Sequence, residues 1–110
     1  MKATDIGAYG EQVAVAYLEK QGYKIVDRNW KTRLCEIDII AQKGDTLYFV
    51  EVKYRSSGAY GDGFAYITPK KLKQMHFAAE MWLQSHAWDK EVSLSALSVT
   101  DGKVEFIETL

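Results

Sequence analysis

The chain has 110 residues, 47% of them hydrophobic and 26% charged, and its formal net charge is −1 at pH 7. This length and composition indicate one small globular domain, residues 1–110. The charge excludes a protein that binds nucleic acid with its whole surface, so such a site must be a local basic patch. A single cysteine excludes an internal disulfide, and no apolar run is long enough for a signal peptide or a membrane span. We therefore expect a cytoplasmic protein that does not contact a membrane.

A first helix is predicted from Thr4 or Asp5, either of which can cap it, up to Gly22, which ends it. Apolar residues recur at helical spacing between these points. Glu11 lies on the same side of this helix as Leu18, and so it faces the sheet. A carboxylate in the first turn also suits the positive end of the helix dipole, which alone would explain Glu11.

The next segments predict three strands. The first is Tyr23–Asp27. Two further apolar runs, 36–41 and 47–55, flank a turn at Lys43-Gly44-Asp45, and this arrangement is typical of a β-hairpin.

Charged residues interrupt both apolar runs of the hairpin. Because strand side chains alternate, Glu51 and Lys53 share one face about 7 Å apart, and Asp38 can face Glu51 across the pair. Burying these charged groups without partners would cost several kcal/mol of folding free energy, so we expect them to contact water, one another or a metal ion. The two carboxylates and a backbone carbonyl, that of Val52, suit Mg²⁺ or Mn²⁺ and indicate phosphodiester hydrolysis. A solvated face with cross-strand ion pairs is the alternative interpretation.

Residues 55–66 contain three glycines and three aromatic residues. Two interpretations are open. The segment is either a connector whose rings pack on the core or a mobile substrate loop whose rings stack on unpaired bases.

A second helix is predicted to begin at Thr68-Pro69, a capping residue followed by proline at the first helical position. Its predicted core stripe consists of Leu72, Met75, Ala79, Trp82 and Leu83. Three lysines in its first turn, Lys70, Lys71 and Lys73, oppose the helix dipole. An anion at this end would relieve the conflict, so we expect these lysines, with Arg55, to bind phosphate groups.

A second hairpin, Val92–Val99 and Lys103–Ile107 around the turn Thr100-Asp101-Gly102, is predicted to close the sheet. The predicted order of elements is therefore αβββαββ, an α/β protein.

A resemblance to a known family rests on two motifs, Glu36-Ile37-Asp38-Ile39-Ile40 and Phe49-Val50-Glu51-Val52-Lys53-Tyr54-Arg55-Ser56-Ser57. They are similar to the core of the YraN-like family, a branch of the PD-(D/E)xK nuclease superfamily. Holliday-junction resolvases and restriction endonucleases belong to that superfamily. The resemblance extends over nearly the whole chain and includes Gly10-Glu11 and Arg28-Asn29-Trp30 near its start.

The resemblance implies a restriction-endonuclease-like three-layer α/β fold, with a mixed sheet of about five strands and a helix on each face. It implies that Asp38 and Glu51 hold the metal ion. Lys53 would orient the attacking water or stabilise developing charge, and Glu11 would assist from the first helix. The implied activity is a Mg²⁺- or Mn²⁺-dependent endonuclease acting on DNA, with branched or junction DNA as one candidate substrate. A non-catalytic module that binds nucleic acid or protein is the alternative.

Three positions depart from the family pattern. Cys35 stands where the family usually has glycine, Ala65 lies where an acidic residue is frequent, and Ser95 replaces an aspartate. Since glycine permits backbone angles that cysteine resists, Cys35 is the departure with a direct consequence for geometry. We expect it to be a packing residue rather than a nucleophile.

Cleavage of both strands of a duplex or junction needs two active sites, and one small domain supplies one. A homodimer, assembled in solution or on the substrate, is therefore expected. Sedimentation velocity with and without a four-way junction should reveal a two-protomer species, and a monomer that cuts both strands in one binding event would contradict this prediction.

Overall fold

The sheet keeps the order of the sequence, because its five strands lie side by side as β1-β2-β3-β4-β5. This computed structural model describes the backbone of residues 3–55 and 63–110, and the side chains of those residues from Ala8 onward. Its elements are α1 (Ala3–Lys20), β1 (Lys24–Lys31), β2 (Glu36–Lys43), β3 (Thr46–Arg55), α2 (Pro69–Gln84), β4 (Glu91–Thr100) and β5 (Lys103–Ile107). The predicted αβββαββ order is confirmed.

The sheet is mixed. Neighbouring strands pair antiparallel except β3 and β4, which are parallel. Parallel neighbours need a crossover connection, and α2 lies within the segment that supplies it. The protein is therefore an α/β protein with a five-stranded mixed sheet, consistent with the predicted restriction-endonuclease-like fold.

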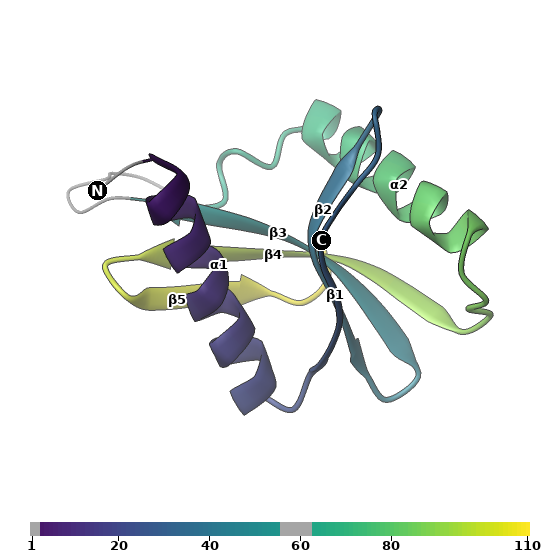
Figure 1. The fold of residues 1–110 in the computed structure, drawn as a ribbon, viewed down its shortest axis with the longest axis horizontal. Helices are drawn as coiled ribbons and strands as arrows, with labels where there is room; N and C mark the ends of the chain where they lie inside the picture. Colours follow the sequence, from purple (N-terminus) through teal and green to yellow (C-terminus); the bar gives the residue numbers. More distant parts are fainter. Residues whose placement is uncertain (1–2, 56–62) are drawn as a thin grey trace.

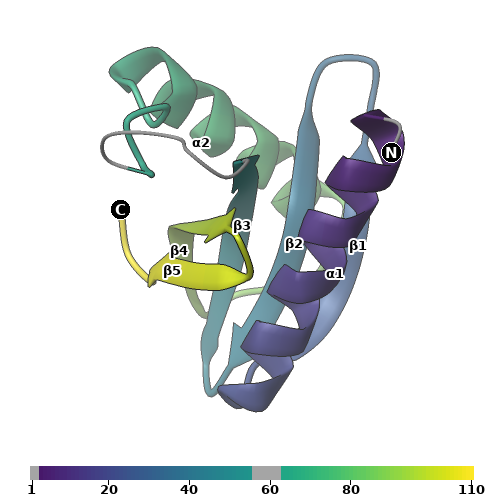
Figure 2. The same cartoon turned by 90° about the vertical axis from the view of Figure 1, so that its left-hand side faces the viewer.

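One helix covers each face of the sheet (Figures 1 and 2). Buried residues of α1, among them Ala14 and Leu18, pack with strand residues such as Ile39 and Val50 in one hydrophobic cluster. Buried residues of α2 form the other cluster with β2 and β3, and they include Ala79 and Trp82. The predicted helix on each face is therefore confirmed.

Several element boundaries differ from prediction. The first helix begins at Ala3, so neither Thr4 nor Asp5 precedes it as a cap. The first strand starts one residue later than predicted and continues to Lys31, because a β-bulge near Val26 lets it stay paired with β2 beyond Asp27. Residues 56–62 of the glycine-rich segment, and with them the choice between connector and substrate loop, lie outside the described residues.

The second helix begins as predicted. Thr68 is its N-cap, with Thr68 Oγ1 accepting a hydrogen bond of 3.1 Å from the Lys71 amide, and Pro69 occupies the first helical position. Of the predicted core stripe, Met75, Ala79 and Trp82 are buried. In the described part of the chain, no helix combines the length and apolar character needed to cross a membrane.

The two departures from the family pattern that can be assessed have local explanations. Cys35 is half-buried against the α2-side cluster and does not adopt a positive φ, so the backbone there does not require glycine. Ser95 is fully buried, and its Oγ donates a 2.5 Å hydrogen bond to the carbonyl of Glu108. Ser95 therefore anchors the end of the chain to β4.

Candidate functional site

Asp38 lies where β2 and β3 separate. Their ladder runs from Lys43 opposite Thr46 to Ile39 opposite Val50 and stops there. One more step would have placed Asp38 opposite Glu51, as predicted. Instead, the backbone N–H of Val52 donates a 2.8 Å hydrogen bond to Asp38 Oδ2. The carboxylate thus takes the position of a missing strand partner.

The alternation of β2 breaks at the same residue. Ile39 packs in the cluster beneath α1, whereas Ile37, two residues away, packs in the cluster beneath α2. In a regular strand these two side chains would share a face. On β1, Asn29 lies between the pairs Arg28–Ile39 and Trp30–Ile37 and has φ 52°, a left-handed value that asparagine tolerates better than most residues. The break places Asp38 between the two layers.

The environment of Asp38 disfavours its ionised form. Burial is the largest effect and raises its pKa to about 7, with the nearby negative charge of Glu51 adding to the increase. The hydrogen bond from the Val52 N–H lowers the pKa, and the charges of Glu36 and Glu11 raise it by smaller amounts than Glu51 does. The negative charges of several carboxylates therefore add to the raised pKa of one buried acid. A cation bound nearby would favour the ionised form of Asp38.

Glu51 is paired with α2. Lys71 Nζ lies 2.9 Å from Glu51 Oε1, and the two side chains are 32% and 19% exposed. The ion pair supplies an anion for one of the three lysines in the first turn of α2, where the sequence predicted a conflict with the helix dipole. Lys71 therefore already has an acidic partner within the chain.

Lys53 and Tyr66 lie next to this pair. Lys53 Nζ is 5.8 Å from the centroid of the Tyr66 ring, and the Tyr66 hydroxyl donates a 3.5 Å hydrogen bond to the carbonyl of Glu51. Burial, with the charges of Glu51 and Asp38, raises the pKa of Tyr66. The hydroxyl therefore stays protonated and remains a donor.

Glu11 reaches the sheet because α1 approaches β3 closely. A Cβ on Gly10 would lie 2.8 Å from Tyr54 Cβ, so only glycine fits there without a shift. Glu11 Oε1 is buried and has no hydrogen bond, and Arg28 Nε lies 3.8 Å from it, too far for one. The predicted inward orientation of Glu11 is confirmed. The explanation by the helix dipole is wrong, because α1 begins at Ala3 and Glu11 lies beyond its first turn.

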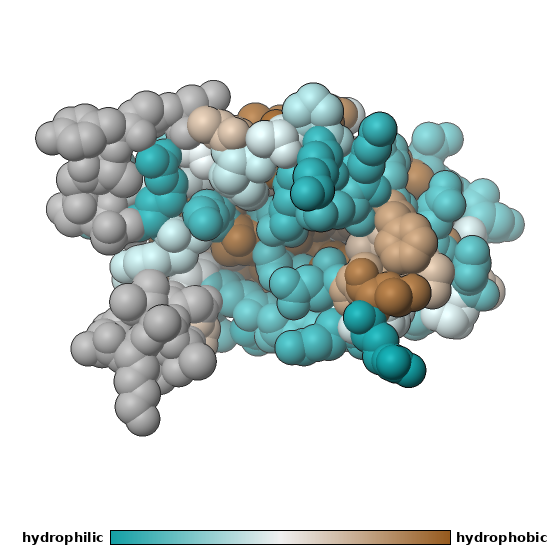
Figure 3. Space-filling model, turned by 90° about the horizontal axis from the view of Figure 1, so that it is seen from above, coloured by the Kyte–Doolittle hydropathy of each residue, from teal (hydrophilic) through white to brown (hydrophobic). Residues whose placement is uncertain are grey.

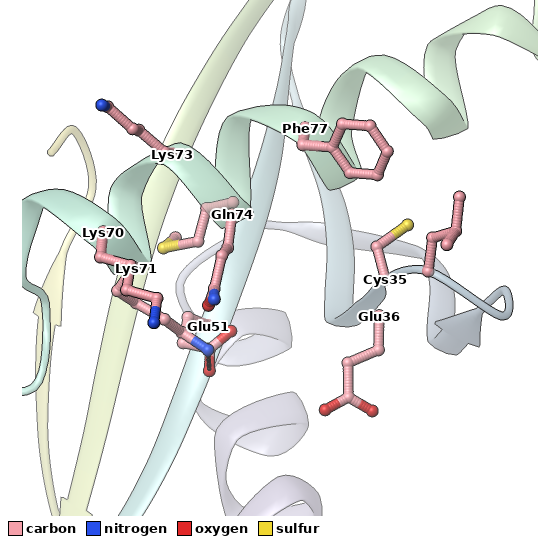
Figure 4. Close-up of a pocket in the computed structure, with 10 residues that line it drawn as sticks. Cys35, Glu36, Glu51, Lys70, Lys71, Lys73, Gln74 and Phe77 are labelled. Carbon is pink, nitrogen blue, oxygen red and sulfur yellow. Dashed lines mark ion pairs between the residues drawn. The ribbon is translucent and has the colours of Figure 1, made fainter.

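A groove of about 490 Å³ runs between α2 and the start of β2. Figure 4 shows Lys70, Lys71, Lys73 and Phe77 along α2, with Cys35 and Glu36 on the neighbouring segment at the start of β2. The groove is also lined by Leu34, Glu36, Glu51, Gln74 and Met75. Arg55, predicted to join the lysines, is not among its lining residues, and its guanidinium lies beside Gly63.

The donor set suits a hydrated hard cation. Among the side chains of residues 8–55 and 63–110, no three from His, Cys, Asp or Glu are grouped to hold an ion, as a closed zinc site would require. Mg²⁺ is commonly bound through one or two carboxylates, with water and phosphate oxygens completing its shell. Asp38 and Glu51 supply such a pair, and Glu11, whose negative charge also raises the pKa of Asp38, lies outside this pair. Val52 contributes its N–H to Asp38, and the role of its carbonyl as a ligand remains a prediction.

Sequence reasoning missed three contributors: Tyr66, Glu36 and Arg28. Tyr66 was grouped with the loop aromatics, and Glu36 was noted only as part of a motif. Arg28 was noted only as part of the motif Arg28-Asn29-Trp30. Arg28 lies opposite Ile39 in the β1–β2 register, and Ile39 faces α1, so Arg28 also faces α1 and lies next to Glu11. Knowledge of this strand register would have placed Arg28 at the site.

Comparisons with known proteins identify relatives over most of the chain. A model of the family described as "Uncharacterised protein family UPF0102" matches residues 10–105. A UPF0102 protein of Beutenbergia cavernae is 45% identical over 101 residues, which cover 90% of this chain and 86% of the relative. A UPF0102 protein of Wolinella succinogenes is 42% identical over 104 residues, covering 94% of each chain. One from Alkaliphilus oremlandii is 51% identical over 81 residues, covering 74% of this chain and 69% of the relative.

The raised pKa of Asp38 predicts a specific pH dependence of stability. Since the native state binds the Asp38 proton more tightly than the unfolded chain, native Asp38 favours folding most below about pH 4, and this contribution is lost as pH rises to about 7. At about 1.4 kcal/mol per pKa unit, the loss is up to about 4 kcal/mol. Urea unfolding of wild type and Asp38→Asn across this range, with chelator present, should show the unfolding free energy of wild type, relative to that of Asp38→Asn, falling by that order as pH rises.

Glu51→Gln is the matched control, because it removes the second-largest cause of the shift and should flatten the pH dependence. Adding Mn²⁺ at pH 7.5 should stabilise wild type more than Asp38→Asn. Parallel stability curves for wild type and Asp38→Asn from pH 4 to pH 7 would show that Asp38 has an ordinary pKa.

Proposed function

Because the chain belongs to the UPF0102, or YraN, family and carries two acids and a lysine beside a cationic groove, we propose that it is a metal-dependent endonuclease that hydrolyses phosphodiester bonds in DNA. The observation that carries the proposal is the proximity of two acidic side chains. Asp38 and Glu51 lie where β2 and β3 part, and the charge of Glu51 helps to raise the pKa of Asp38. Accepting a hydrogen bond from the Val52 N–H does not by itself require a second carboxylate close enough to disfavour ionisation of Asp38.

Asp38 and Glu51 are the proposed metal ligands, with Val52 as a backbone contributor. When bound, Mg²⁺ or Mn²⁺ lowers the pKa of a water molecule and offsets the charge of the transferring phosphate. Asp38 Oδ2 is fixed by the Val52 N–H, so the ligand geometry is set before substrate binds. Glu11, on α1, would accept a hydrogen bond from water at its Oε1, which faces Arg28 but has no hydrogen bond within the described residues.

Lys53 is the proposed electrostatic catalyst. It follows Glu51 by two residues, and its ammonium group lies near the face of the Tyr66 ring. Lys53 is exposed, and its cation on this strand would stabilise the negative charge that develops on the phosphate oxygens. Tyr66 and the Glu51 carbonyl together hold this end of the site in place.

Phosphate binding is proposed for the lysines of the groove. Lys70 and Lys73 line it together with Lys71, whose ammonium pairs with Glu51. Arg55, at the end of β3, would contact the DNA backbone outside the groove. DNA with branches or junctions is the proposed natural substrate class.

The catalytic assignment predicts that Lys53→Ala retains metal and DNA binding but cleaves at least about a hundredfold more slowly, because the lysine acts on the transition state. Glu51→Gln should weaken Mn²⁺ binding as well. Single-turnover cleavage with Mg²⁺ or Mn²⁺ should be measured on duplex, single-stranded, flapped and four-way-junction DNA. Calorimetric titration of Mn²⁺ should accompany it.

Lys103→Ala, an exposed lysine on β5, is the matched control and should cut at the wild-type rate. A Lys53→Ala protein that cuts as fast as wild type would remove this lysine from the mechanism. A wild type that binds DNA but cuts none of these substrates would support the binding-module alternative.

The groove lysines predict a change in salt dependence. Each phosphate contact releases counterions, so Lys70→Ala and Lys73→Ala should each lower the slope of log K against log salt by roughly one unit. Lys71→Ala should lower it less in chelator, because its charge is directed at Glu51. Fluorescence anisotropy from low to moderate salt measures the slope, and an unchanged slope in the Lys70→Ala/Lys73→Ala double variant would exclude this groove as the phosphate site.

A further inference from the structure

The groove has an apolar end that the proposed chemistry does not use. Phe77 is 45% exposed and Leu34 is 73% exposed, and both line the groove. Figure 4 shows the Phe77 ring near Cys35, farther along α2 than Lys70. The face viewed in Figure 3 likewise carries hydrophobic surface, in brown and tan, directly beside hydrophilic surface. Exposed apolar surface beside a polar rim often marks an interaction site.

Leu34 is exposed by an ordered turn. Thr32 Oγ1 accepts hydrogen bonds of 3.1 Å and 3.3 Å from the amides of Leu34 and Cys35, and the Thr32 amide donates a 2.8 Å bond to the Cys35 carbonyl. These bonds fix the backbone on both sides of Leu34. Its exposure is therefore a property of the fold rather than of a frayed end.

The wall formed by α2 changes character along its length. Lys70, Lys73 and Phe77 follow one another at spacings of three and four residues, so they lie on one face of the helix, and all three line the groove. Lys73 and Phe77 are separated by one turn, about 6 Å along the axis. A cation and an aromatic ring at this separation match the phosphate and the base of one nucleotide.

We propose that this end of the groove is a subsite for one unpaired nucleobase. The base stacks on Phe77 and packs against Leu34, while its phosphate contacts Lys70 and Lys73. The groove volume of about 490 Å³ is in the range of small-molecule sites and admits a nucleotide. The lysines favour an anionic occupant of this kind over a neutral apolar peptide.

The subsite deepens the proposed function, on which it rests, by naming a substrate class. A base inside a duplex is stacked and paired, and it reaches a groove only after unpairing, which has an energetic cost. Single strands, flaps and junctions with unpaired nucleotides do not incur that cost. The protein should therefore prefer DNA that contains unpaired bases.

The experiment measures binding without catalysis. Wild type, Phe77→Ala, Phe77→Leu and Phe77→Trp are titrated, with chelator present, into a labelled single strand, the same strand with abasic sites, and the corresponding duplex. Phe77→Ala should weaken single-strand binding about tenfold, as expected for one lost base–aromatic stack, and duplex binding less than about twofold. Phe77→Trp should retain affinity, and Phe77→Leu should lose most of it, because leucine keeps the apolar bulk but not the ring.

Two controls make the result specific. Val92→Ala removes a hydrophobic side chain of similar exposure, 47%, outside the groove and should bind like wild type. On the abasic strand, wild type and Phe77→Ala should bind equally. Because Phe77 is partly exposed, thermal unfolding should confirm that its variants are folded.

Three outcomes overturn the subsite. They are normal single-strand binding by Phe77→Ala, equal losses on single strand and duplex, and a persisting difference on the abasic strand. Normal binding by Phe77→Ala alongside metal-dependent cleavage by wild type would remove the subsite and leave the proposed function intact. A wild type that binds none of the three nucleic acids would remove both.

Discussion

The hydrogen bond from the Val52 N–H to Asp38 Oδ2 is the contact on which the site depends. Where β2 and β3 separate, β3 loses its partner on the β2 side while it stays paired with β4, and a buried amide left without an acceptor would be costly. The Asp38 carboxylate supplies the acceptor at 2.8 Å. The consequence is a buried acid next to Glu51, and the cost of that arrangement is visible in a pKa raised to about 7.

The other two acids are balanced by cations from different elements. Glu51 on β3 pairs with Lys71 from the first turn of α2, and Glu11 on α1 lies 3.8 Å from Arg28 on β1. The charge pairs thus connect both helices to the sheet. The hydrogen-bond partner of Asp38 is an uncharged amide, so no cation of the described residues balances its carboxylate in the way that Lys71 and Arg28 balance the other two. An added cation would therefore act most strongly on the ionisation of Asp38.

The sequence was sufficient where a regular pattern governs the structure. Helical and alternating periodicity gave the seven elements in order, and Thr68-Pro69 gave the start of α2. The shared face of Glu51 and Lys53 followed from simple alternation. Contacts between distant elements were not accessible in this way, because the Glu51–Lys71 pair depends on where α2 packs on the sheet.

Alternation failed at one position, and the reason is physical. Asp38 was expected to face Glu51 as the next pair of a regular ladder, but that ladder ends at Ile39 and Val50. The left-handed backbone of Asn29 accompanies the break, and a period of two residues cannot reveal a single residue with positive φ. The family resemblance identified Asp38 as important without indicating that it lies at an irregularity.

The same irregularity connects the acids to the groove. Because alternation reverses at Asp38, Ile37 and its partner Trp30 pack on the α2 side of the sheet, although Ile39 packs on the α1 side. The chain just before Ile37 is thereby brought toward α2. This segment, 34–36, and the face of α2 then form the two walls of one groove, with Glu51 among the residues that line it. The two neighbouring acids and the groove between segment 34–36 and α2 are thus two results of a single break in strand geometry.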